Sequence, residues 1–154
     1  MIGKSLLAEQ FLKHLEKNKD KVFFYTYDQE LTGYECIFLV KEILKFLQKY
    51  SIQSVGIASK NSIYWPLFYI AAKMTVKDVY IFDPNLPSKT IKETTQRYSI
   101  ECLFSKLDLS AGFDSDAADI YPQNFERRFI KDGLNDVLFT SGTTGEPKGV
   151  VISE

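Results

Sequence analysis

The chain has 154 residues, of which 45% are hydrophobic and 25% are charged, and its formal net charge is -1. This length suits one domain with a core of its own, and the composition is that of an ordinary soluble globular protein. The nearly neutral charge argues against a nucleic-acid-binding protein, which needs a concentrated basic surface. Cys36 and Cys102 lie far apart in the sequence, so we expect two buried thiols in a cytoplasmic protein rather than a disulfide or a metal site.

Neither a signal peptide nor a membrane span is expected. Residues 1–17 carry polar side chains in every turn and lack the apolar run of a signal peptide. The most apolar stretch, IYWPLFYIAA, has about half of the roughly 20 residues that a membrane helix needs, and it contains Pro66.

The first elements in the chain are a helix and a strand. Leu7, Phe11 and Leu15 recur at helical spacing and predict an amphipathic helix over residues 5–17. The run VFFYTY, residues 22–27, then predicts a strand.

A turn and a second helix come next. Residues 28–30 are predicted to form the turn. Thr32 and Glu35 have the spacing of a capping box, in which each side chain accepts a hydrogen bond from the backbone N–H of the other residue. The helix that follows carries an apolar stripe made of Cys36, Val40, Ile43, Leu44 and Leu47.

Short apolar runs then alternate with helical patterns. Asn61 or Ser62 is the expected cap of one helix, in which Pro66 is close enough to the start to be tolerated, and Ser88 is the expected cap of another. The predicted strands are 54–59, 79–82, 102–105 and 136–140, followed by an extended segment at 150–152.

Residues 106–133 interrupt this rhythm and are expected to form a solvated connection with one extra strand near Ile120. No spacing among the aspartates there matches a metal-ligand loop. The alternation of short apolar strands and helices predicts an α/β fold, in which three layers place helices on both faces of a mostly parallel sheet. The strand at 136–140 delivers the segment that follows it to the carboxyl edge of this sheet, where ligands bind in open α/β folds.

That segment, FTSGTTGEPKGV at residues 139–150, has the residues of a phosphate-binding loop. Its glycines allow backbone amides to turn toward an anion, its hydroxyl groups donate hydrogen bonds, and Lys148 adds a positive charge. It is not a Walker A loop, because Pro147 stands where that motif has its second glycine and Gly149 follows the lysine. The extended pattern at 150–152 also predicts a strand after the loop in place of a helix.

The run T-S-G-T-T-G-x-P-K-G at 140–149 closely resembles the signature loop of the adenylate-forming superfamily, which includes acyl-CoA synthetases, luciferases and peptide-synthetase adenylation domains. LTGYE, VGIASKNSIYWPLFYIAA and VYIFDPNLP resemble upstream segments of the same family. The sequence departs from the family pattern at Gly33, where a tyrosine is usual, at residues 76–78, where Ala-Gly is usual, and at Glu154, where many members have a histidine near the acyl pocket.

The resemblance implies that residues 1–154 are the first α/β subdomain of an AMP-binding domain, truncated after the signature loop. The whole enzyme would activate a small carboxylic acid with ATP and Mg²⁺ as an acyl-adenylate, then pass the acyl group to coenzyme A or to a carrier pantetheine. By this resemblance Lys148 is catalytic and Thr140 helps to place Mg²⁺. The implied phosphate-binding residues are Thr140, Ser141, Gly142, Thr143, Thr144, Gly145 and Lys148.

Two further expectations follow. The fragment alone is inactive, because the remaining groups of the site belong to the missing carboxyl-terminal part. It also associates with itself through apolar surface that a longer chain would bury. The alternatives are a stand-alone nucleotide- or phosphate-binding module, an adenylation domain of a carrier-protein-dependent synthetase, and an interaction module of a larger synthetase assembly.

Overall fold

The structure, a computed structural model, describes residues 5–76, 78–106, 109–110, 112–114, 118–121, 135–140 and 146–153, with only the backbone described at 140 and 153. Its helices and strands follow the alternation that the sequence predicts. The elements are α1 (Leu6–Lys17), β1 (Val22–Tyr25), β2 (Glu30–Thr32), α2 (Gly33–Lys49), β3 (Ser54–Ile57), α3 (Trp65–Thr75), β4 (Asp78–Ile81), α4 (Ser88–Arg97), β5 (Cys102–Phe104), β6 (Ala118–Ile120), β7 (Asn135–Thr140) and β8 (Lys148–Ser153).

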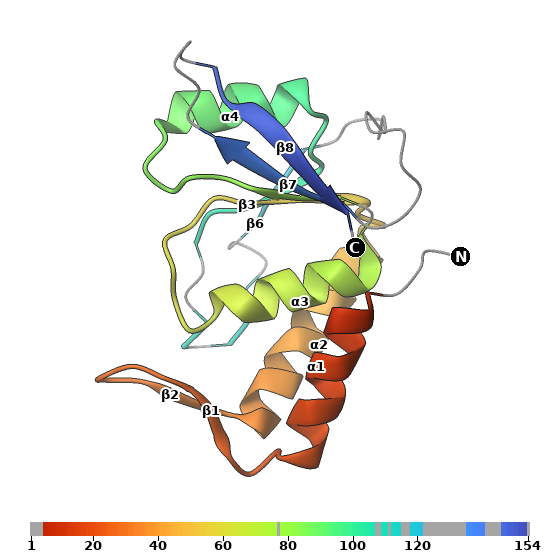
Figure 1. The fold of residues 1–154 in the computed structure, drawn as a ribbon, viewed down its shortest axis with the longest axis vertical. Coiled ribbons are helices and arrows are strands. Elements are labelled where there is room, and N and C mark those ends of the chain that lie inside the picture. The colour runs from red at the N-terminus through yellow and green to blue at the C-terminus, as the bar shows by residue number, and fades with distance from the viewer. Residues whose placement is uncertain are drawn as a thin grey trace.

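The main sheet has the order β6-β5-β3-β4-β7-β8, and its four central strands are parallel. The edge strands β6 and β8 each pair antiparallel with their neighbour. Helices α1, α2 and α3 lie on one face of this sheet and α4 lies on the other (Figure 1). The predicted three-layer α/β fold is therefore confirmed, as are the neighbouring positions of the four predicted parallel strands and the extra strand at Ile120.

Each face of the sheet has its own core. The larger core joins α1, α2 and α3 to one face and includes Leu15, Val40, Ile43 and Phe68. The smaller core lies on the α4 face and includes Tyr80, Phe82, Ile100, Leu103, Val137 and Phe139.

Polar side chains fix the amino ends of the strands. The Glu101 carboxylate accepts hydrogen bonds from the backbone N–H groups of Gln53 (2.7 Å) and Ser54 (3.0 Å), so it ties β3 to the chain before β5. The buried Asn135 side chain donates to the Asp78 carboxylate at 3.0 Å, and these two residues are partners in the β4–β7 register. A shift of register by one residue would separate these pairs, so they specify the strand alignment.

The departure at Gly33 has a structural explanation. A Cβ atom at this position would lie 2.9 Å from the Cα of Lys19 and 3.0 Å from the carbonyl oxygens of Leu15 and Asn18. The start of α2 therefore approaches the end of α1 too closely for any side chain.

The turn predicted at 28–30 is wrong in its last residue. The backbone N–H of Thr26 donates to the carbonyl of Gln29 at 2.7 Å, and Glu30 already belongs to β2, which pairs antiparallel with β1. A three-residue strand is too short to show a periodic pattern in the sequence.

The predicted caps at Asn61 or Ser62 and at Ser88 are also wrong. Helix α3 begins at Trp65, which places Pro66 in the first turn, where its missing N–H has no helical partner to lose. A cap at Asn61 or Ser62 would have moved Pro66 deeper into the helix, where a hydrogen bond would be lost. In α4, Ser88 is the first helical residue and Pro87 occupies the cap position, without a side-chain hydrogen bond.

Both cysteines are buried and free, as expected. Burial is the main cause that raises the pKa of Cys36 to about 11 and that of Cys102 to about 12, so both thiols are protonated and inert at neutral pH. In the part of the chain that the structure describes, every helix is too short or too polar to cross a bilayer.

The capping box at the start of α2 is confirmed. Thr32 Oγ1 accepts from the backbone N–H of Glu35 at 3.3 Å, and the Glu35 carboxylate accepts from the backbone N–H of Thr32 at 2.8 Å. These hydrogen bonds lower the pKa of Glu35 from its ordinary value of 4.5. Because the folded-state pKa is depressed, the stabilisation is present above pH 4.5 and is lost as the pH falls through the folded-state pKa.

We therefore predict that Thr32→Ala lowers the free energy of unfolding by about 1 kcal/mol at neutral pH. For Glu35→Gln, the difference from wild type should shrink between about pH 7 and about pH 3, as measured by urea unfolding. Glu16→Gln, an exposed change on α1, is the matched control and should have no effect at either pH. An equal loss for Glu35→Gln at both values would contradict this account.

Candidate functional site at the carboxyl edge of the sheet

The carboxyl ends of β3, β4, β5 and β7 lie at one edge of the sheet, since these strands are parallel. The chain leaves β3 toward α3 on one face and leaves β4 toward α4 on the other, which makes this edge a topological switch point (Figure 1). A crevice of about 470 Å³ opens there. Its lining comes from the segments after β3, β4 and β5: Ala58, Ser59, Lys60, Asn61, Ser62, Pro84, Ser105 and Lys106.

The signature segment begins and ends at this same edge. Thr140 is the last residue of β7, Lys148 is the first residue of β8, and the two are partners in the antiparallel register. The strand after the loop is confirmed, so the segment joins two strands, unlike a Walker A loop. The predicted phosphate-binding residues Ser141, Gly142, Thr143, Thr144 and Gly145 lie outside the described residues, as does the side chain of Thr140.

The return of the chain into β8 is fixed against α4. The Arg97 guanidinium, at the end of that helix, donates to both carboxylate oxygens of Glu146 at 3.2 and 3.3 Å. Pro147 is buried, and Lys148 follows with an exposed side chain. The paired strands and this two-point contact hold Lys148 beside the end of β7.

β7 is tied to α3 by a charged contact on the face that carries the three helices. Asp136 accepts from the Tyr69 hydroxyl at 2.5 Å and from the Lys73 ammonium at 3.1 Å. The Lys73 side chain is 1% exposed and that of Asp136 is 15% exposed, so the ion pair is largely shielded from water. Removing one partner of such a pair is costly because it leaves the other charge buried.

The other face of β7 is held by aromatic packing. Phe139 lies 4.7 Å from Phe82 and 5.0 Å from Tyr98, measured between ring centroids. Gly149 pairs with Phe139 on the neighbouring strand, and a Cβ there would lie 2.9 Å from Val137 Cγ1. Because a valine side chain is stiff, this close approach requires glycine. The motif glycine at 149 therefore has a packing role, and β7 is anchored from both faces just before Thr140.

Sequence reasoning named Thr140 and Lys148 as site residues, which stays a prediction. It missed the residues that position them, namely Tyr69, Lys73, Arg97, Asp136 and Glu146. One signal was present: Lys73 stands in the apolar run IAAKM, where a buried charge needs a partner. The partner could not be inferred, because Asp136 lies 63 residues away in the sequence.

The described residues contain no group of three His, Cys, Asp or Glu side chains that could hold a metal ion. A dedicated protein cage for a metal is therefore not seen in this part of the chain. In nucleotide sites, substrate phosphates and water supply most of the ligands of Mg²⁺, and the protein supplies one or two. The Mg²⁺ role predicted for the Thr140 hydroxyl therefore does not require such a cage.

The sequence is 27% identical to bacitracin synthase 2 of Bacillus licheniformis over 161 residues. The match covers 96% of this chain but 6% of that protein. No protein-family model matches the chain.

Solved structures share the fold across nearly the whole chain. O-succinylbenzoate coenzyme A synthetase (MenE) from Bacillus subtilis, in complex with AMP, matches with a TM-score of 0.63 and 17% identity, over 91% of this chain and 41% of that one. The N-terminal subdomain of NpsA from Klebsiella oxytoca, in complex with 3-hydroxyanthranilyl-AMSN, matches with a TM-score of 0.63 and 22% identity, over 94% of this chain and 39% of that one. The chain thus spans well under half of the solved chains it matches. It has the fold of the amino-terminal subdomain of the adenylate-forming enzymes, as the signature motif indicated.

Proposed function

We propose that the chain is the amino-terminal, phosphate-binding part of an ATP-dependent ligase that activates a carboxylic acid as an acyl-adenylate. The observation that carries this proposal is the pairing of Thr140 with Lys148, which brings both ends of the T-S-G-T-T-G segment to the carboxyl edge of the sheet. Structures that share the fold support it, since o-succinylbenzoate coenzyme A synthetase is described in complex with AMP and in complex with an acyl-adenylate intermediate.

The chemistry assigns a role to each part of the segment. ATP supplies the adenylyl group, and the carboxylate of the acid attacks the α-phosphorus while pyrophosphate leaves. The hydroxyl and backbone N–H groups of residues 141–145 would hold the β- and γ-phosphates, so that the α-phosphate faces the acid. Lys148 would offset the negative charge that builds on the leaving pyrophosphate, and the Thr140 hydroxyl would help to hold Mg²⁺.

A thiol then takes the acyl group and releases AMP. The thiol is that of coenzyme A or of a carrier pantetheine, and relatives of both kinds are found, a coenzyme A synthetase and an adenylation–carrier fusion. Assay of the full-length enzyme with each of the two thiols distinguishes them. The 154-residue chain alone should not catalyse the reaction, because the groups that hold the ribose and orient the α-phosphate belong to the rest of the enzyme.

A stand-alone nucleotide-binding module is the second candidate. The anchoring of β7 and of Glu146 would serve such a module equally well, since both hold the ends of the phosphate-binding segment. The reading frame after residue 154 separates the two: a stop codon in the natural gene favours the module, and a continuing adenylation domain favours the ligase.

The proposed role of Lys148 can be tested by substitution. In the full-length enzyme, Lys148→Ala should slow ATP–pyrophosphate exchange by about 100- to 1,000-fold, which is the typical loss when one donor to a developing charge is removed. Thiol transfer from a pre-formed acyl-adenylate should change much less, because no pyrophosphate leaves in that step. Lys41→Ala, an exposed change on α2, is the control and should leave exchange unaltered. Normal exchange by Lys148→Ala with a panel of carboxylic acids would refute the assigned role.

The exposed edge strand β8 favours association of the 154-residue chain with itself. In the described part of the chain, β8 has β7 as its one strand neighbour, and Val150 and Ile152 are 51% and 52% exposed. The other sheet edge, β6, is protected, because it is three residues long and carries Asp119. We infer that β8 pairs with β8 of a second copy when no further chain covers it.

Light scattering should then show a concentration-dependent dimer. Val151→Lys, which puts a charge on the edge strand, should return it to a monomer, whereas Leu7→Lys on α1 should not. A wild-type monomer at several hundred micromolar would exclude this pairing.

A further inference from the structure

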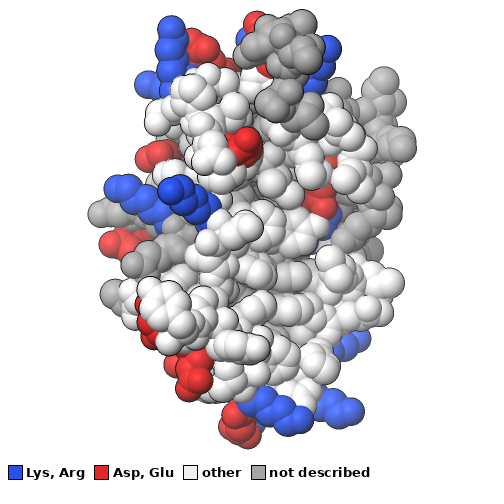
Figure 2. All heavy atoms as spheres, turned by 60° about the vertical axis from the view of Figure 1, so that its left-hand side comes forward, with Lys and Arg blue, Asp and Glu red and all other residues white. Residues whose placement is uncertain are grey.

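The contact of Asp136 with Tyr69 and Lys73 places a charge in the protein interior. Lysine and carboxylate side chains usually reach water, and Figure 2 shows charged groups projecting from the surface on the face that it views. The Lys73 side chain is instead buried, with its ammonium 3.1 Å from the Asp136 carboxylate. Replacing a buried ion pair by apolar residues of similar volume is often neutral or stabilising, so fold stability is a weak reason for this one.

The donors to Asp136 come from successive turns of α3. This helix follows the carboxyl end of β3 and precedes the amino end of β4, so it runs in the opposite direction to β7. Tyr69 and Lys73 are four residues apart and both donate to the same carboxylate. Trp65, one turn earlier, stacks on Tyr69 with ring centroids 5.6 Å apart. Two donors at different heights along the helix fix β7 along the helix axis as well as across it.

Apolar packing holds this face of β7 less firmly. Leu138 lies on the same face as Asp136, since alternate residues of a strand share a face, and Val150 and Ile152 are the β8 partners of these two residues. Leu138, Val150 and Ile152 are 36%, 51% and 52% exposed. Among the β7 side chains that the structure describes on this face, Asp136 is therefore the one that joins the strand to the helix layer.

We propose that Asp136 is a positioning residue for the adenylation half-reaction, held in place by Tyr69 and Lys73. This inference rests on the proposed function. Thr140 lies four residues further along β7, about 13 Å away, so a displacement of the strand moves the start of the phosphate-binding segment with it. Asp136 acts through the strand and not by contact with the substrate. A misplacement of about 1 Å in such a support can slow a reaction about 100-fold.

A variant that removes all three polar groups separates positioning from stability. Tyr69→Phe, Lys73→Met and Asp136→Val together leave none of these groups buried without its partner, so the triple variant should resist urea as well as wild type does. In the full-length enzyme, kcat for ATP–pyrophosphate exchange should fall about 10- to 100-fold, while KM for ATP changes less than about threefold. Thiol transfer from a pre-formed acyl-adenylate should be unaltered, because that step uses no pyrophosphate.

Tyr69→Phe is the milder variant, and it decides alone if the triple variant fails to fold. It removes one donor to Asp136 and keeps the ring that stacks on Trp65. The Lys73 ion pair also remains, so the effect is smaller: kcat for exchange should fall at least about threefold, with KM for ATP and resistance to urea retained.

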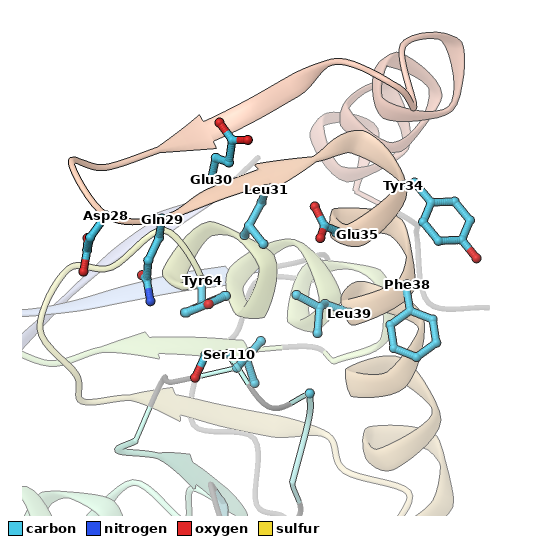
Figure 3. A pocket seen from close by; sticks show the side chains of 12 residues that line it. Asp28, Gln29, Glu30, Leu31, Tyr34, Glu35, Phe38, Leu39, Tyr64 and Ser110 are labelled. Atoms are coloured by element: carbon cyan, nitrogen blue, oxygen red, sulfur yellow. The ribbon is translucent and has the colours of Figure 1, made fainter.

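Two controls match these variants at sites remote from β7. Lys45→Met with Glu42→Gln removes an exposed ion pair on α2. Tyr34→Phe removes one hydroxyl group from the pocket beside the hairpin, a cavity of about 460 Å³ between the β1–β2 hairpin and α2 (Figure 3). The hairpin lies in the lower part of Figure 1, and β7 and β8 lie in the upper part. Neither control should change exchange or thiol transfer.

Three results would overturn the proposal. They are normal kcat for exchange in a stable triple variant, an equal loss of exchange and of thiol transfer, and, where the triple variant does not fold, normal exchange by Tyr69→Phe. The second result would show general damage to the enzyme in place of a misplaced phosphate-binding segment. Failure of the proposed function is a different result, because the wild-type enzyme would then show no exchange with any carboxylic acid of the panel.

Discussion

The position of the proposed phosphate-binding segment depends on how β7 is held in the sheet. This strand is fixed on one face by the contact of Asp136 with Tyr69 and Lys73, and on the other by the packing of Phe139 among aromatic rings. A buried ion pair has strict geometric requirements, because only well-aligned hydrogen bonds and close charges offset the hydration that the two groups lose. The aromatic cluster also restricts the position of β7, because close-packed rings leave no room for a shifted strand. The end of β7 is therefore a rigid support, and catalysis benefits from groups placed on such supports.

The second support is β8 together with the chain that enters it. Arg97 and Glu146 join the start of β8 to α4, and Gly149 lets β8 lie close against Val137. The Arg97–Glu146 pair is exposed, so it orients the chain more than it stabilises the fold. The residues around the motif therefore fix the positions of its two ends, Thr140 and Lys148, whereas the donors that we propose for phosphate belong to the motif itself.

Local sequence signals predicted the fold well where the interaction is local. The capping box of Thr32 and Glu35 is formed within four consecutive residues, so its residues alone predict it. The parallel order of the sheet followed from short apolar strands that alternate with helices. The hairpin strand Glu30–Thr32 and the start of α3 could not be predicted, because the first has only three residues and the second is decided by the place of Pro66.

At the candidate site, the phosphate-binding role of the motif stays a prediction, and the sequence did not indicate the residues that hold the two ends of the motif in place. Thr140 and Lys148 were named as site residues because the motif that contains them is long and specific, and the structure adds that they are partners in the β7–β8 register. The contacts of Asp136 and Arg97 join residues 63, 67 and 49 positions apart, and no pattern in a single sequence reports such pairs. The pocket beside the hairpin was also beyond prediction, since it needs β2, α2 and Ser110 to be brought together.

The central claim is that residues 140–148 bind the phosphates of ATP. The most direct measurement is a titration of the isotopically labelled 154-residue chain with pyrophosphate and with ATP, with and without Mg²⁺, followed by amide chemical shifts. The account predicts that the amides of residues 140–148 shift and saturate, that a sugar without phosphate has no such effect, and that Lys148→Ala weakens the binding. Shifts confined to other regions, or no shifts at millimolar ATP, would contradict it.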